Sequence, residues 1–597
     1  MTMPRTGRAL WTAVTVSFRA DRARATAVVV LSAVASLAGV LGAYWLKRIV
    51  DAAGAGDERS ALWAASVIGV TAGMALMLRA SVTRMQFPLK ENTGLYLDRR
   101  LVSMVGGIPS IEHHERPDYL DRLEVLRREM PVLAFAGVTS AGAVALLAQV
   151  MATALLLASV NPWLLAVPLF AAPSLWAGAK AERIRQAALD ATAERSRRAR
   201  YLFELATSPT AGKELRVFEA GGEVLDRHAR DWQETDRLLD AAAARGLAWE
   251  AAGWLLFSIG YGAGIVLVAG QAVSGRATVG DVVLALALVA QVSGQVSAAA
   301  GSVGAFARMS TVAERFLWLG AYATDSQQQA GLIVTAPDRL TEGIELRGVA
   351  FRYPGTETDV LARFDLSLPA GATVAVVGDN GAGKTTLVKL LCKFYEPSEG
   401  AITVDGTDLA GIDTAEWRER TSAGFQDFAR LELQAGQAIG VGDLPHLDDP
   451  DAVATALDRA ASTDVVSALP DGLVTQLGAS FESGVQLSGG QWQKLALARA
   501  MMRPEPLLLV LDEPTAAVDA DTEHMLFGRY AAMASTLAAS LGAITLLVSH
   551  RFSTVRMADL IVVVEGGRIA EAGSHEELMT AGGLYAELYE LHAHGYR

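Results

Sequence analysis

The chain has 597 residues, of which 51% are hydrophobic and only 20% charged, with a mean hydropathy of +0.28. This composition is too apolar for a disordered protein, and its charged fraction lies below the roughly 25% usual for soluble domains. The single cysteine, Cys392, excludes an internal disulfide framework and any multi-cysteine metal site, and a net charge of −13 argues against a nucleic-acid partner.

Long runs without Asp, Glu, Lys or Arg occupy the first half of the chain. They cover residues 25–46, 60–78, 130–179, 251–275 and 282–307. About 20 helical residues cross a hydrocarbon core of about 30 Å. Four runs therefore predict one span each, and the longest, broken by the turn dipeptide Asn161-Pro162, predicts two. We expect an all-α polytopic membrane domain of six spans over residues 1–320; buried helices of a soluble protein are the alternative, which five such runs disfavour.

Basic side chains predict how these spans are oriented. Residues 1–26, 81–132 and 179–246 together carry 26 Lys and Arg, whereas the alternate loops carry four. Because cytoplasmic loops of membrane proteins are enriched in Lys and Arg, we expect both termini in the cytoplasm. The second and third basic segments are expected to be helices that continue from the spans.

The second half has a different pattern. Residues 331–597 carry 19 basic and 37 acidic side chains, and a polar linker is expected over residues 321–342. Strands are predicted over residues 344–352, 373–377, 507–511 and 544–548, with a helix over 384–393. Strands that alternate with helices favour an α/β domain with a mostly parallel sheet, over residues 343–597.

A phosphate-binding motif, G-x-x-x-x-G-K-T, follows the strand over residues 373–377. Its glycines let backbone N–H groups surround phosphates at the start of a helix. We expect Lys384 to reach the β- and γ-phosphates of ATP and Thr385 to bind Mg²⁺. A glycine-rich turn with a surface lysine is the alternative, which the flanking strand and helix disfavour. The residues expected to bind nucleotide here are Gly378, Asp379, Asn380, Gly381, Ala382, Gly383, Lys384, Thr385 and Thr386.

Two carboxylates, Asp512 and Glu513, follow the apolar strand over residues 507–511. Charges at the end of a buried strand are costly unless each has a partner. Mg²⁺ beside Asp512 and an attacking water beside Glu513, as general base or water-positioning group, would supply both. His550 follows the strand over residues 544–548, at the carboxyl edge of the sheet where ligands bind in open α/β folds. A structural role is the alternative for a single histidine.

Leu487-Ser488-Gly489-Gly490-Gln491, placed between the P-loop and the Asp-Glu strand, resembles the LSGGQ signature of ATP-binding-cassette (ABC) ATPases. The family's other marks occur in order. The resemblance implies that Tyr353 stacks on adenine and that Gln426 lies in a loop that senses Mg²⁺. It implies that His550 is the switch residue and that Asp519 lies in a loop at the nucleotide. The signature residues that it implies bind nucleotide are Ser488, Gly489, Gly490 and Gln491.

Six spans followed by one cassette resemble an ABC exporter half-transporter, so the resemblance covers nearly the whole chain. It implies an ATPase coupled to transport in the inner membrane of a bacterium. It also implies a second chain, because in this family the P-loop of one cassette and LSGGQ of another enclose each ATP. A homodimer is expected, and a heterodimer stays open. Short coupling helices that contact the cassettes are expected near residues 110–122 and 212–222; within the first, Glu112-His113-His114-Glu115 offers a metal site as a minor alternative.

The segment over residues 477–494 is similar to exporters of lantibiotics and related ribosomal peptides, because LG-x-x-F-x-x-G replaces the usual T-x-x-G-E-x-G before LSGGQ. We therefore expect export of a peptide or amphipathic natural product. A lipid flippase or multidrug pump is the alternative, and an importer with this architecture is a further one. A soluble ABC ATPase of DNA repair or translation is disfavoured by the six predicted spans.

Overall fold

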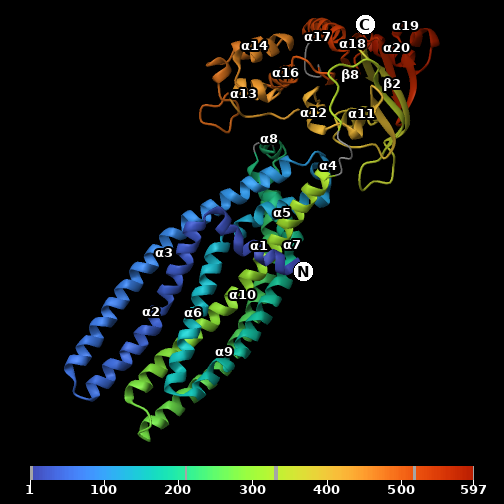
Figure 1. Cartoon of the computed structure of the whole chain (residues 1–597). Coiled ribbons are helices and arrows are strands. Elements are labelled where there is room, and N and C mark those ends of the chain that lie inside the picture. Colours follow the sequence, from blue (N-terminus) through green and yellow to red (C-terminus); the bar gives the residue numbers. More distant parts are fainter. Residues whose placement is uncertain (1–4, 209–210, 329–333, 515–519, 596–597) are drawn as a thin grey trace. The chain divides into compact units, whose positions relative to one another are not determined.

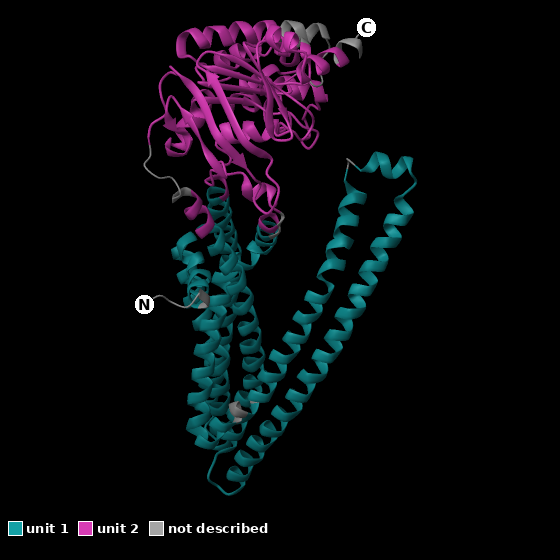
Figure 2. Ribbon diagram, turned by 90° about the vertical axis from the view of Figure 1, so that its right-hand side faces the viewer, with its two compact units in different colours: residues 1–104, 122–320 teal, residues 105–121, 321–597 magenta. Residues whose placement is uncertain are grey.

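The computed structural model describes residues 5–208, 211–328, 334–514 and 520–595 (Figure 1). The chain forms two compact units (Figure 2). The first contains residues 1–104 and 122–320, and the second contains residues 105–121 and 321–597. A short segment of the helical half therefore groups with the α/β half, from which it is separated by about 200 residues of sequence.

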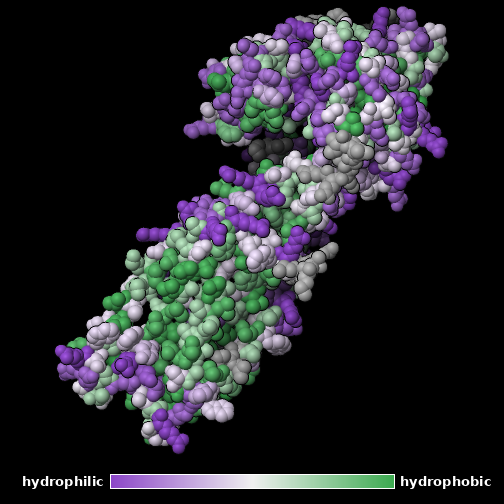
Figure 3. Space-filling model, in the orientation of Figure 1, coloured by the Kyte–Doolittle hydropathy of each residue, from purple (hydrophilic) through white to green (hydrophobic). Residues whose placement is uncertain are grey.

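The first unit is built from helices, some of which extend a few residues into the second. They are α1 (Arg5–Ala20), α2 (Arg22–Gly54), α3 (Glu58–Gly106), α5 (Pro117–Ala134), α6 (Ala136–Val160), the 3₁₀ helix η1 (Pro162–Ala171), α7 (Ala172–Thr207), α8 (Gly212–Val217), α9 (Gly221–Val273) and α10 (Val279–Gln328). Figure 3 shows a broad hydrophobic surface over this unit. Within the described residues, five helices are long and apolar enough to cross a membrane: α2, α3, α6, α9 and α10.

The fourth predicted span differs from the expectation. Its charge-free residues form η1 and the start of α7 rather than one continuous α-helix. Pro162, Pro168 and Pro173 lie in this stretch, and each lacks the N–H that an interior turn of an α-helix would use. The absence of charge therefore identified an apolar segment correctly but did not identify its conformation.

The segments expected to continue from the spans into the cytoplasm are helical. α3 has 49 residues and α9 has 53, about twice the length that a bilayer requires. The polar stretch expected as a linker begins in helix too, because α10 continues to Gln328.

Helices α7 and α9 lie side by side and are joined through α8. Small residues allow their backbones to approach: a Cβ added at Gly253 would lie 2.8 Å from the Cα of Ser174. The Ser174 hydroxyl donates a hydrogen bond to the Gly253 carbonyl at 2.8 Å. Gly260, expected as a close-packing position, is buried against Phe170 of η1. Close glycine contacts of this kind are a common basis of helix association in membranes.

The second unit contains two sheets and their covering helices. Its elements are α4 (Glu112–Glu115), β1 (Gly343–Phe351), β2 (Leu361–Pro369), β3 (Thr373–Val377), α11 (Lys384–Leu391), β4 (Glu399–Val404), β5 (Thr407–Asp408), η2 (Leu409–Gly411), α12 (Thr414–Glu419), β6 (Thr421–Gly424), α13 (Ala435–Gly440), η3 (Leu444–His446), α14 (Pro450–Arg459), α15 (Thr463–Ser467), η4 (Gly472–Val474), α16 (Gly489–Ala500), β7 (Leu508–Asp512), α17 (Ala520–Leu541), β8 (Ile544–Val548), α18 (Phe552–Val555), β9 (Leu560–Glu565), β10 (Arg568–Gly573), α19 (His575–Ala581) and α20 (Leu584–Gly595).

The larger sheet has the strand order β10-β9-β3-β8-β7-β6, and the smaller, antiparallel sheet has the order β2-β1-β4-β5. In the larger sheet, β9, β3, β8, β7 and β6 are parallel and only β10 is antiparallel. The predicted strands over 373–377 and 544–548 coincide with β3 and β8, and the other predicted strands and the helix agree within two residues. The expected mostly parallel α/β domain is confirmed.

We predict that Gly253→Val destabilises the α7–α9 pair, because its side chain would overlap the backbone of Ser174. Overpacking of this kind costs about 1–3 kcal/mol. Thermal unfolding of the purified full-length chain should show a lower midpoint. Gly262→Val is the matched control on the same helix, because in the described structure nothing lies within 4 Å of a Cβ added there. Equal midpoints for the two variants would contradict the assigned contact.

Candidate functional site

The parallel sheet brings the candidate residues to one edge. Val376 of β3 and Asp512 of β7 are both paired in register with Val548 of β8. Because the three strands run parallel, the residues that follow them emerge together. These residues are the glycine-rich loop after β3, Asp512-Glu513 at the end of β7, and His550 after β8. Gln426 joins them because it follows β6, which pairs with β7.

The loop between β3 and α11 follows a path that requires glycine. Gly378 has φ +150°, and a Cβ there would lie 2.1 Å from the Val564 carbonyl oxygen. Gly383 has φ +109° and is the N-cap of α11, which begins at Lys384. The first backbone N–H groups of a helix lack partners within the helix, so the start of α11 is suited to an anion such as phosphate.

Lys384 lies inside this loop. Its ammonium donates hydrogen bonds to the carbonyl oxygens of Gly378 at 2.7 Å and Asp379 at 2.9 Å. The side chain is almost fully buried and these partners are neutral, so the charge is available to a phosphate that enters the loop. A hollow of about 350 Å³ lies there, lined by Gly378, Asp379, Asn380, Gln426, Glu513 and His550 together with Val377, Phe552 and Leu588.

Asp512 and Thr385 are suited to a divalent cation. The Asp512 carboxylate is 3% exposed and lies 3.5 Å from the Thr385 hydroxyl. Burial, with a smaller contribution from the neighbouring charge of Glu513, raises the pKa of Asp512 to about 6. A cation at this position would reverse both effects, and carboxylate and hydroxyl oxygens are ligands that Mg²⁺ prefers. The residues therefore fit Mg²⁺, with Gln426 as a further oxygen donor.

Glu513 is held by the other two candidate catalytic residues. The Gln426 side-chain amide donates to Glu513 Oε2 at 2.7 Å, and His550 Nδ1 lies 3.2 Å from Glu513 Oε1. The Glu513 backbone has φ +48°, an uncommon value for a residue with a side chain. Its side chain is 14% exposed at the hollow, so the carboxylate can contact a water while neighbours fix its orientation.

The LSGGQ segment forms the start of α16. Ser488 is the N-cap, and its hydroxyl and the Gln491 side chain bond reciprocally to backbone N–H groups in a capping box. Gly489 and Gly490 form the first turn. Among the described residues that line the hollow, none comes from this segment. Within one chain, the structure therefore does not bring the predicted LSGGQ residues to the P-loop.

Tyr353 lies beside the P-loop helix, since its hydroxyl is 3.1 Å from the Thr386 hydroxyl. The remaining P-loop residues, Gly381 and Ala382, connect the two glycines of the loop. Asp519 lies outside the described residues, so its predicted contact with nucleotide stays a prediction.

One supporting residue was missed by the sequence analysis. The Gln493 amide, almost fully buried, donates to the carbonyl oxygen of Pro514 at 3.0 Å and lies 3.4 Å from that of Glu513. It thereby connects α16 to the backbone that positions Glu513. Its place two residues after the LSGGQ segment was the available signal, but a polar residue on a helix is usually exposed.

Comparison with known families agrees with this geometry. Residues 361–516 match the family model described as ABC transporter. These residues contain the P-loop, Gln426, the LSGGQ segment, Asp512 and Glu513. The second unit therefore contains an ABC transporter ATPase domain.

Curated relatives are similar over part of the chain. An ATP-dependent lipid A-core flippase of Ralstonia nicotianae is 41% identical over 256 residues, which are 42% of this chain and 41% of the relative. A second flippase of that name, from Bordetella avium, is 33% identical over 334 residues, 56% of this chain and 54% of the relative. The mitochondrial potassium channel ATP-binding subunit of Rattus norvegicus is 40% identical over 257 residues, 42% of this chain and 34% of the relative. The chain thus matches about half or less of the length of these relatives.

Structural similarity extends over the whole chain. A solved structure of a bacterial Atm1-family ABC exporter with ATP bound aligns with 96% of this chain and 98% of its own, with a TM-score of 0.73 and 22% identity. At this identity the likeness shows the fold, and that fold is a helical membrane domain followed by an ABC ATPase cassette.

We predict that Glu513→Gln abolishes steady-state ATP hydrolysis but preserves ATP binding. The substitution keeps the side chain's size and its contact with Gln426 but removes the carboxylate that would accept a proton from water. General bases contribute about 10²–10⁴-fold to rate. Phosphate release and nucleotide binding should be measured on the same preparation. Hydrolysis at the wild-type rate would contradict the assignment.

Lys384→Ala should instead weaken ATP binding by at least about tenfold, because it removes a buried cation from the phosphate site. Equilibrium binding of a fluorescent ATP analogue would measure this loss. Lys393→Ala is a suitable control, since Lys393 lies beyond the end of α11 and bonds to the Ile412 carbonyl. Unchanged affinity in Lys384→Ala would refute its role.

Proposed function

We propose that this chain, whose second unit contains an ABC transporter ATPase domain, is one half of an ATP-driven exporter that moves a lipid-like amphipathic molecule across a bacterial inner membrane. The observation that carries the proposal is the buried P-loop lysine and the paired carboxylates at one sheet edge, in a chain that also contains five membrane-length apolar helices. ATP hydrolysis and a membrane domain in a single chain favour transport over a soluble ATPase role.

The hydrolytic step follows from the positions of the side chains. Lys384 and the start of α11 would hold the phosphates, and Asp512 with Thr385 would hold Mg²⁺, which would neutralise phosphate charge. Glu513 accepts a proton at a carboxylate oxygen from the water whose oxygen bonds to the γ-phosphorus, while the bond from that phosphorus to the bridging oxygen breaks and ADP leaves. Gln426 and His550 keep that carboxylate directed into the hollow. Burial and the neighbouring charge of Glu513 raise the pKa of Asp512, so a cation at this position would favour the ionised carboxylate.

A second chain is part of the proposal. The capping-box turn at the start of α16 does not line the hollow of its own cassette. It can complete a phosphate site only on another cassette. A homodimer satisfies this requirement, because the same chain contributes both Glu513 and Ser488 and two complete sites result. The cassettes are proposed to lie in the cytoplasm, as the basic loops predict.

The cargo proposal depends on the named relatives. Two of them are called lipid A-core flippases, which supports the flippase alternative over the peptide expected from residues 477–494. Peptide transport receives no support from the relatives, whose names refer to a lipid or to a potassium channel subunit. The hydrophobic surface of the first unit is compatible with a lipid that enters from the bilayer (Figure 3).

The experiment is reconstitution of the full-length chain in liposomes with fluorescent phospholipid and glycolipid probes. Wild type with ATP and Mg²⁺ should move probe between leaflets, and Glu513→Gln should not. The variant is the matched control because it is expected to bind ATP normally. ATP-dependent uptake of amphipathic peptides without lipid movement would overturn the lipid proposal in favour of peptide export. Hydrolysis without movement of either class would overturn both cargo assignments.

Labelling of the two termini tests the proposed orientation. Single cysteines introduced near each end of a Cys392→Ser chain should react with a membrane-impermeant reagent only after the bacterial cells are permeabilised, because both ends are expected inside. Reaction in intact cells would contradict this topology.

A further inference from the structure

The Glu112-His113-His114-Glu115 motif lies in the loop between α3 and α5 and has no part in the site described above. It forms α4, which belongs to the same compact unit as the cassette. The two glutamates have separate partners: Glu112 pairs with Arg116 in its own loop. Among the described residues no cluster of three or more metal-ligating His, Cys, Asp or Glu side chains occurs, so the minor metal alternative gains no support. Glu115 has contacts of a different kind.

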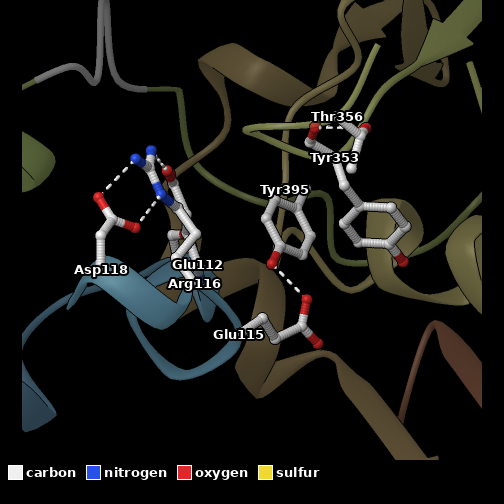
Figure 4. Close-up of polar contacts among 8 residues, drawn as sticks. Glu112, Glu115, Arg116, Asp118, Tyr353, Thr356 and Tyr395 are labelled. Atoms are coloured by element: carbon white, nitrogen blue, oxygen red, sulfur yellow. Dashed lines mark hydrogen bonds and ion pairs between the residues drawn. The ribbon is translucent and has the colours of Figure 1, made fainter. Parts of the chain in front are cut away.

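Both carboxylate oxygens of Glu115 bond to cassette residues. Lys389 of α11 donates to Oε1 at 2.6 Å, and the Tyr395 hydroxyl donates to Oε2 at 2.5 Å. Figure 4 shows Glu115 directed toward Tyr395, apart from the group formed by Glu112, Arg116 and Asp118. The side chains of Glu115 and Lys389 are 35% and 21% exposed, so the pair is shielded from solvent on most sides. Hydrogen bonds to a carboxylate are about twice as strong as neutral ones.

The two partners of Glu115 both contact Tyr353. The Lys389 ammonium lies 5.1 Å from the centre of the Tyr353 ring, within the range of a cation–π interaction. The Tyr395 ring meets the Tyr353 ring edge-on, with centroids 5.5 Å apart and an interplanar angle of 86°. Burial lowers the pKa of Lys389, but the hydrogen bond that Lys389 donates to Glu115, together with the interactions with Tyr353 and with the Glu115 charge, outweighs burial, and the net pKa is raised. Lys389 is therefore charged where it faces the ring.

The space beside Tyr353 is open. A hollow of about 580 Å³ is lined by Tyr353, Lys389, Tyr395 and Glu115, with neighbouring residues of both segments. Tyr353 is only partly buried, so close packing alone does not fix the direction of its ring. The ring also meets the Phe351 ring edge-on, with centroids 4.9 Å apart. Its orientation depends on this contact, on the hydroxyl contact with Thr386 and on the two side chains that Glu115 holds.

We propose that Glu115 is a positioning residue for nucleobase binding: by holding Lys389 and Tyr395, it sets the orientation of the Tyr353 ring on which the base of ATP stacks. The inference rests on the proposed function, which assigns that stacking role to Tyr353. Glu115 belongs to the loop that connects α3 with α5. Binding of the base and docking of this loop on the cassette are then thermodynamically coupled. Each of the two events changes the equilibrium constant of the other by the same factor.

The test is the ATPase kinetics of the full-length chain. Glu115→Gln keeps the size of the side chain but removes the charge that pairs with Lys389. It should raise the KM for ATP about threefold to fivefold, the range expected for a partly exposed cation–π contact, and leave kcat unchanged. Glu112→Gln is the matched control on the same helix, because it removes the same charge from a side chain whose ion pair is with Arg116 rather than with Lys389. It should leave the KM unchanged.

A double-mutant cycle with Tyr353→Ala separates positioning from a general structural role. Without the ring, Glu115→Gln should cause no further rise in KM. Lys389→Met, which keeps the apolar stem, should give the same KM rise in the wild-type background and none with Tyr353→Ala. A rise that persists without the ring, or a KM for Glu115→Gln equal to that of wild type, would overturn the inference.

The failure of this inference is distinguishable from failure of the proposed function. If Lys384→Ala loses ATP binding and Tyr353→Ala raises the KM but Glu115→Gln does not, only the positioning role is wrong. If Lys384→Ala binds ATP as wild type does, the proposed ATP-driven function is wrong and the inference with it.

Discussion

The second unit depends on the buried parallel strands β3, β7 and β8, whose carboxyl ends share one edge of a sheet. Their residues are almost completely buried, so the chain can present polar groups only where the strands end. The register places Gly378, Asp512 and His550 at that edge, although 172 positions separate the first from the last in the sequence. A phosphate loop, a cation ligand and a candidate base therefore meet without any long side chain having to reach across the sheet.

The position of Asp512 and Glu513 at this edge of the sheet also explains how their charges affect each other. Two adjacent carboxylates at the end of a buried strand are unfavourable to fold unless one is protonated or a cation is present. This cost is seen in the raised pKa of Asp512. The Glu513 carboxylate, in contrast, accepts a hydrogen bond from the Gln426 amide and lies beside His550. Asp512 faces the P-loop threonine, whereas Glu513, whose backbone is left-handed, lines the hollow. The two residues of one dipeptide are therefore placed for two different roles.

Much of this architecture could be predicted from the sequence, because each prediction depended on a local pattern. The strands over 373–377 and 544–548 are uninterrupted β-branched or apolar runs that end at Gly378 and Ser549, and the structure places β3 and β8 on the same residues. The fourth span could not be predicted in the same way. Charge counting measures polarity, whereas the conformation of residues 162–171 depends on prolines that remove backbone donors. Gln493 was missed because its burial depends on the position of a neighbouring strand.

The contacts of Glu115 show a stronger limit of sequence reasoning. Lys389 lies 274 positions away, and neither residue belongs to a motif whose spacing predicts a partner. Their meeting depends on residues 105–121 folding with the cassette rather than with the helices that flank them in sequence. A displacement of α4 relative to α11 would break the charge-assisted hydrogen bonds of Glu115 next to Tyr353. Glu115 is one of several contacts between this loop and the cassette, because Arg418 donates a hydrogen bond to the Pro109 carbonyl and Ile111 packs against the cassette core. Among these contacts, those of Glu115 are the ones that reach Lys389 and Tyr395 beside Tyr353.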